Sequence, residues 1–197
     1  MTLVAEPRRL CLVLERIPET VFEPEFVAEA PLIRFEAYAD RGRIFGWVRL
    51  HEDRLTDLLN ENAELLLVNA ELEDFEDGRR SSADEILVHR QQLIAVHASG
   101  PRGRDHLRQP TTAHPVSVHA GPYRIGGRVH APPDADPVLD FHRRPAMVPL
   151  TEAWIEYRTG HIRERQAVGT LVINRDLAQR IELTTDELAI DEAAVPG

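Results

Sequence analysis

Two loop segments in this sequence carry polar side chains that could grip a ligand. His89-Arg90 and Asn174-Arg175 each follow an apolar run, so each pair is predicted to lie at a tight connection between strands. A guanidinium group beside an imidazole or an amide can bind a phosphate, a carboxylate or the edge of a base. The competing interpretation is turn chemistry with surface ion pairs, and the residue types alone favour it.

Two aspartates recur at matched places, Asp57 in the first half of the chain and Asp140 in the second. A repeated carboxylate could serve as a ligand, but aspartate more often caps a turn or a short helix. Asn60 forms an Asp-x-x-Asn motif with Asp57. The candidate ligand-binding or partner-binding residues of the sequence are therefore Asp57, Asn60, His89, Arg90, Asp140, Asn174 and Arg175.

The sequence contains no recognisable catalytic or metal-binding constellation. All 23 basic residues are arginine, which excludes a lysine nucleophile, a Schiff base and a phosphate-loop lysine. No serine stands in a Gly-x-Ser-x-Gly turn, and Cys11 is the only cysteine. The nine histidines lack the spacing of zinc enzymes. We therefore expect no catalytic residues, no metal and no cofactor.

Four blocks of sequence recur in the same order, which indicates two diverged copies of one unit. The distance between matched blocks drifts only from 81 to 85 residues, and such a period is typical of a repeated small domain. The matched blocks are Arg43–Val48 with Arg124–Val129, Leu55–Leu58 with Val138–Phe141, Leu65–Ala70 with Val148–Ala153, and Leu87–Arg90 with Val172–Arg175.

Each copy consists of short apolar segments separated by turn-forming clusters, which predicts about five strands. The first strand pair is expected to turn at Asp40-Arg41-Gly42, and its counterpart at Gly121-Pro122. A short helix is predicted over Glu52–Leu59, whereas Pro132-Pro133 and Pro137 leave room for hardly a turn in the second copy. Five short strands in so few residues usually close into a small barrel, because closure hides the sheet edges.

The expected fold is mainly β, with two tandem five-stranded small β-barrels and little helix. A strand is predicted at Leu10–Leu14 and a short helix at Thr185–Ile190. Aromatic side chains within apolar strands are expected in the cores or between the barrels, namely Trp47, Trp154, Tyr157 and Phe75. The expected boundaries are an N-terminal extension over 1–30, a first barrel over 31–98, a linker over 99–113, a second barrel over 114–183 and an acidic tail over 184–197.

This pattern resembles the Sm-like small β-barrels. The resemblance rests on a glycine-bearing central strand, on the Asp57-x-x-Asn60 motif and on the strand-turn-strand segment Leu87–Val96. In that family an aspartate and an asparagine, together with an arginine and a glycine in the next loop, shape a pocket for an RNA base. The resemblance therefore implies the barrel fold, a ring-forming habit and RNA binding.

The formal net charge of −10 disfavours RNA as a partner, because nucleic-acid binding relies on attraction to phosphates. Residues 31–98 hold 8 arginines against 14 acidic residues, whereas residues 99–182 hold 12 arginines against 9. An acidic half and a basic half can attract each other, within one molecule or between neighbours. The chain shows neither a secretory signal nor a long apolar run, so we expect no membrane contact and a cytoplasmic location.

The leading hypothesis from the sequence is a non-enzymatic assembly or adaptor protein that associates with a protein partner or with itself. A contact between unlike faces would be heterologous and could close a ring. One alternative is an RNA- or nucleotide-binding Sm-like module that uses His89, Arg90, Asn174 and Arg175. A second alternative is an enzyme with its site between the two barrels, which no residue pattern in the sequence supports.

Overall fold

The computed structural model describes residues 30–101 and 110–185. The strand predicted at Leu10–Leu14 and Cys11 lie outside these residues, as does the helix predicted from Thr185 onward, apart from its first residue. Within the described residues, no helix has the length and apolar character needed to cross a membrane.

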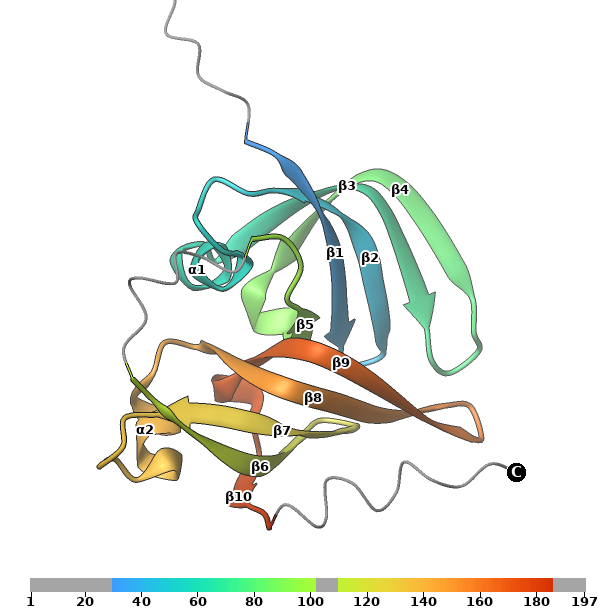
Figure 1. Ribbon diagram of the computed structural model, residues 1–197. Coiled ribbons are helices and arrows are strands. Elements are labelled where there is room, and N and C mark those ends of the chain that lie inside the picture. Colours follow the sequence, from blue (N-terminus) through green and yellow to red (C-terminus); the bar gives the residue numbers. More distant parts are fainter. Residues whose placement is uncertain (1–29, 102–109, 186–197) are drawn as a thin grey trace, which may run out of the picture.

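The two halves of the chain contain the same kinds of elements in the same order, and they lie one above the other in Figure 1. The first half consists of β1 Leu32–Ala39, β2 Gly42–Arg49, α1 Leu55–Glu61, β3 Glu64–Asp74, β4 Arg80–His89, the 3-10 turn η1 Arg90–Gln92 and β5 Leu93–His97. The second half consists of β6 Thr112–Ala120, β7 Tyr123–Ala131, α2 Pro137–Arg143, β8 Met147–Thr159, β9 Ile162–Asn174, the 3-10 turn η3 Arg175–Leu177 and β10 Arg180–Leu183.

All ten strands belong to one sheet in the order β10-β6-β7-β8-β9-β5-β1-β2-β3-β4, with antiparallel pairing throughout. The mainly-β class predicted from the sequence is confirmed, but the prediction of closed barrels is wrong. Strand β5 pairs with β1 along one side and with β9 of the other half along its second side. Because both sides of β5 are occupied, β5 cannot close the first half against β4. Within the part of the chain that the structure describes, the sheet therefore stays open and ends in β4 and β10.

The two predicted hairpin turns are confirmed. Ala39 and Gly42 are the pair of residues nearest the turn between β1 and β2, so the chain reverses through Asp40 and Arg41. Strands β6 and β7 reverse through Gly121 and Pro122, and Gly121 has a φ of +57°. That backbone conformation is in the left-handed region, where glycine carries no side-chain penalty.

The helices differ from the prediction in the second half. Helix α1 begins and ends a few residues later than expected, and α2 is a full helix of seven residues where hardly a turn was predicted. Pro137 is the first residue of α2, where a missing N–H is harmless and the fixed φ favours the helix. Asp136 caps this helix by accepting hydrogen bonds from the N–H groups of Val138 and Leu139, both at 2.9 Å. The prolines therefore start the helix instead of preventing it.

Two hydrophobic cores lie against the sheet, and each takes side chains from both halves. The core of the first half includes Met147 and Val172, which belong to the second half. The core of the second half includes Tyr38, Ile94 and Ala95, which belong to the first half. The two halves are therefore packed together by shared apolar burial and not only by backbone pairing.

The four aromatic residues expected inside the protein divide into two groups. Phe75 and Tyr157 are buried and stack on each other where the halves meet, with ring centroids 4.7 Å apart, which confirms the expectation for this pair. Trp47 is 43% exposed, so its predicted burial is wrong. Trp154 is half-buried on β8, with the guanidinium group of Arg165 over its ring at 4.0 Å.

Candidate functional site

The loop arginines bind backbone carbonyl groups of the helices. Arg90 Nη1 donates to the carbonyl oxygens of Leu59 and Asn60 at 3.3 and 2.8 Å. Arg175 occupies the matching position in the second half, and its Nη1 donates to the carbonyl oxygen of His142. These carbonyls lie in the last turn of each helix, where the main chain offers them no partner. Both guanidinium groups are therefore used to hold α1 and α2 against the sheet.

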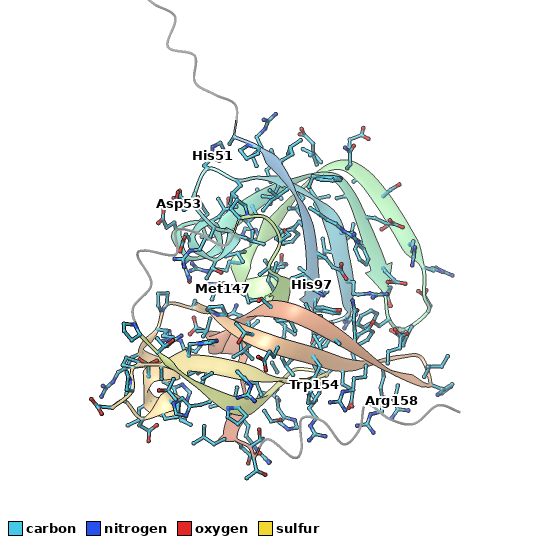
Figure 2. All side chains as sticks on the ribbon, in the orientation of Figure 1. His51, Asp53, His97, Met147, Trp154 and Arg158 are labelled. Carbon is cyan, nitrogen blue, oxygen red and sulfur yellow. The ribbon has the colours of Figure 1, made fainter. Side chains whose placement is uncertain are left out.

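Asn60 joins the two halves through the main chain of one residue. Its Nδ2 donates to the carbonyl oxygen of Met147 at 3.0 Å, and its Oδ1 accepts a hydrogen bond from the N–H of Met147 at 2.9 Å. Met147 lies at the boundary between the halves in Figure 2 and is almost fully buried. One amide side chain thus satisfies both polar groups of a residue that enters a strand.

Asn174 makes a second link between the halves. Its Nδ2 donates to the carbonyl oxygen of Arg90 at 3.2 Å, and its Oδ1 accepts from the N–H of Asp176 at 3.1 Å. Asn174 is one of the few buried polar residues, so these bonds satisfy an amide that water cannot reach. The structure therefore brings together three of the seven candidate residues, namely Asn60, Arg90 and Asn174.

Asp57, Asp140 and His89 take no part in these side-chain links between the halves. Asp57 pairs with Arg54 at 2.8 Å, and Asp140 pairs with Arg144 at 2.6 Å, so each aspartate forms an ion pair at its own helix. His89 is exposed on β4, with its Nδ1 3.3 Å from a carboxylate oxygen of Glu64. Neither aspartate caps a helix; Asp136 was missed as a cap, although a position directly before Pro137 is a usual signal.

The junction itself is a short antiparallel pairing of β5 with β9. Ala95 lies opposite Ile173, Val96 opposite Val172, and His97 opposite Leu171. His97 lies where the halves meet in Figure 2, and its Nε2 is 3.3 Å from the hydroxyl oxygen of Tyr38. The Tyr38 hydroxyl in turn donates to Oε1 of Gln166 at 2.9 Å, across the junction. Apolar pairing and a short polar chain thus hold the two halves in one register.

Burial shifts the titration of the groups at this junction. Desolvation raises the pKa of Tyr38 to about 12 and lowers the pKa of His97, so both side chains stay neutral near pH 7. Nearby, Arg43 lies over the rings of Phe75 and Tyr157 and bonds Glu73 at 2.6 Å. These interactions stabilise the packed state.

The two end strands of the sheet carry exposed apolar side chains. Leu87 on β4 is 55% exposed and Leu183 on β10 is 52% exposed. Soluble proteins usually protect such edges, because an unpaired strand is ready to pair with another chain. The sequence pattern did not mark these strands as edges, since β4 and β10 have close counterparts in β9 and β5 that are paired on both sides.

A surface depression of about 550 Å³ lies at the hairpin turns and is open to solvent. Arg158 at this end of the molecule is labelled in Figure 2. Within residues 30–101 and 110–185, histidine, cysteine, aspartate and glutamate side chains form no group of three that could hold a metal ion. The depression is lined by Arg41, Phe75, Glu76, Arg158, Gly160 and His161.

Comparisons of this chain with protein-family models, with curated proteins and with solved structures found no match.

Proposed function

We propose that this chain is a non-enzymatic assembly protein, built from a duplicated β unit, that associates with further copies of itself through the two open ends of its sheet. The observation that carries this proposal is the pairing of β5 with β9. It is a contact between two units of the same design. Strand β4 of the first half corresponds to β9 of the second half, and strand β10 of the second half corresponds to β5 of the first half. Among residues 30–101 and 110–185, no strand pairs with the outer side of β4 or β10, so both stand at the ends of the sheet.

Matched details of backbone and side chain support the duplication. Asn69 in β3 and Glu152 in β8 both have a φ of 49°, a rare conformation for residues other than glycine. Arg90 and Arg175 both bind carbonyls at the end of the preceding helix. Features as uncommon as these, at equivalent places, favour a common origin for the two halves.

The character of the sheet ends supports association. An edge strand offers a row of free N–H and C=O groups, and strand addition satisfies them while side-chain contacts set the specificity. Leu87 and Leu183 are exposed at these ends and would lose contact with water in such a pairing. The difference in charge between the halves would draw unlike ends together.

RNA binding stays a prediction of the Sm-like resemblance, and we do not adopt it as the proposed function. The two arginines on which it rests are engaged with backbone carbonyls, and Asn60 is engaged with Met147. The charge of −10 offers no general attraction for phosphates. For the enzyme alternative, the depression at the hairpin turns is open and brings together no nucleophile with a base.

Sedimentation velocity of the full chain over a wide range of concentrations tests the proposal. We expect the mass to rise with concentration from the 22.3 kDa of one chain to a multiple of it. Because charges contribute to the contact, the rise should shift to higher concentration at high salt. A mass of one chain at every concentration would contradict the proposed function.

A further inference from the structure

The internal junction defines what a contact between two chains requires. Within one chain, β5 of the first half lies beside β9 of the second half. The counterpart of β5 is β10, and the counterpart of β9 is β4. If the same contact is made between chains, then β10 of one chain lies beside β4 of the next chain. The pair of chains then still has one free β4 and one free β10.

The register of such a contact follows from matched pairings inside each half. Strand β5 pairs with β1 at Ala37 and Val96, and strand β10 pairs with β6 at Val118 and Ile181, so Ile181 corresponds to Val96. In the same way Leu65 pairs with Val88 and Val148 pairs with Ile173, so Val88 corresponds to Ile173. Both correspondences have the same sequence offset, and together they fix the register in which β10 would pair with β4.

We propose that two copies of this chain join head to tail, with β10 of one copy antiparallel to β4 of the next, in the register of the internal β5–β9 pairing. This inference rests on the proposed function and adds the surface and the alignment. Ile181 then lies opposite Leu87, in the place of Val96 and Val172. Val172 is fully buried in the internal junction, whereas Leu87 is 55% exposed in the single chain. The exposure of Leu87 is that of a junction residue whose partner is missing.

The polar links of the internal junction also have counterparts at the free ends. Asn60 corresponds to Arg143, the last residue of α2, and Met147 corresponds to Glu64, the first residue of β3. Both counterparts are exposed in the single chain. The contact between chains would therefore place a cation against a carboxylate where the internal junction has an amide against a backbone. This pair gives the two unlike ends complementary charge.

A second polar link of the internal junction has a similar counterpart at the free ends. Asn174 donates to the carbonyl oxygen of Arg90 inside the chain, and the matching residues at the free ends are His89 and Arg175. A histidine ring N–H can donate to that carbonyl as an amide does. The remaining differences make the outer contact more polar than the inner one, because Arg180 and Glu182 replace Ala95 and His97. We expect it to be weaker than the internal junction and sensitive to salt.

The geometry of the pairing suggests where to place cysteines as a test. The N–H of Ala98 donates to the carbonyl oxygen of Thr170 at 3.0 Å. Hydrogen-bonded and non-hydrogen-bonded pairs alternate along antiparallel strands, and the non-hydrogen-bonded pairs have the shorter distance between Cα atoms. The next pair, His97 and Leu171, is therefore a non-hydrogen-bonded pair. The corresponding pair between chains is Glu182 and Ile86. Closely spaced pairs bring the two Cα atoms within the range that a disulfide spans.

The experiment uses full-length chains with Cys11→Ser. One chain carries Glu182→Cys and the other carries Ile86→Cys, and the mixture is oxidised and run on a non-reducing gel. A single chain with His97→Cys and Leu171→Cys is the positive control for the internal junction. The register control replaces Ile86→Cys by Ser82→Cys, which is exposed four residues further along β4. We expect a mixed dimer of about twice 22.3 kDa with Ile86→Cys and at least about tenfold less with Ser82→Cys.

Charge reversal provides an independent readout that does not depend on disulfides. Arg143→Glu and Glu64→Arg should each raise the dissociation constant at least about tenfold, and the chain with both changes should recover. Equal cross-linking at Ser82, absent cross-linking, or absent recovery in a chain that still associates would overturn the head-to-tail register and leave the proposed function standing. A wild-type chain that never associates would remove both proposals.

Discussion

The side chain of Asn60 holds both main-chain polar groups of Met147, 87 residues further along the chain, with hydrogen bonds of 3.0 and 2.9 Å. This contact fixes the end of α1 against the start of β8, and it lies beside the apolar pairing of β5 with β9. The residue that the sequence marks as a candidate ligand contact is therefore a structural link between the two halves.

Replacing Asn60 should weaken the whole fold. Asn60→Ala leaves the N–H and the carbonyl of Met147 without their partner, and we expect a loss of about 1–3 kcal/mol in the free energy of unfolding. Urea denaturation measures this loss. Asn62→Ala is the matched control, because the Asn62 amide bonds only Leu58 in its own helix, and its cost should be smaller. Equal costs for the two variants would show that the link to Met147 carries no special weight.

The aromatic stack at the junction should be far more important than the exposed tryptophan. Phe75→Ala removes a buried ring stacked on Tyr157 and should cost about 3–4 kcal/mol. Trp47→Ala, at a side chain that is 43% exposed, should cost about 1 kcal/mol or less. Thermal or chemical unfolding of both variants gives the comparison. If Trp47→Ala cost as much as Phe75→Ala, the assigned cores would be wrong.

The loop arginines should contribute to stability through the helices. Arg90→Ala and Arg175→Ala each remove donors from carbonyls in the last turn of a helix, and each should cost about 1–2 kcal/mol. Arg79→Ala is the control, because the Arg79 side chain is 86% exposed and pairs only with Asp77 in a turn. An exposed pair of this kind contributes little. Denaturation midpoints that moved as far for Arg79→Ala would contradict the assignment.

Acid should weaken the junction through His97. Burial lowers the pKa of His97, so the unfolded chain binds a proton at higher pH than the folded chain does. The carboxylate of Glu36, 3.6 Å away, opposes this shift, while Arg34 and Arg43 add to it. Stability should therefore be complete above the ordinary histidine pKa of about 6.5 and fall as the pH drops below it. In urea unfolding at pH 7.5 and 5.5, the loss should be smaller in His97→Gln than in the wild type; equal losses would place the acid sensitivity elsewhere.

Local sequence patterns predicted the elements of the fold well. Alternation of apolar residues and the turn residues Asp40-Arg41-Gly42 and Gly121-Pro122 located the hairpins, because turn geometry and side-chain alternation are properties of short segments. The second helix was missed because Pro137 was treated as a helix breaker, although proline is well tolerated at the first position of a helix.

The arrangement of the strands could not be predicted in the same way. Whether β5 closes its own half or pairs with β9 depends on which partner buries more apolar surface, and the alternation of β5 is the same in both cases. The candidate residues illustrate the same limit. Asn60, Arg90 and Asn174 were selected for their polarity and their repeated positions, but only the junction shows that they bind backbone groups.

If copies of this chain associate through the two open ends of the sheet, then a change on an end strand must block assembly, and light scattering can measure this. Leu87→Asp places a carboxylate on the outer strand β4, whereas Ile162→Asp makes the same change at the β8–β9 turn, where the side chain is 68% exposed and lies on neither edge strand. We expect Leu87→Asp to remain at the mass of one chain at concentrations at which the wild type and Ile162→Asp both form assemblies. Assembly of Leu87→Asp to the same mass as the wild type would show that the chains do not associate through β4.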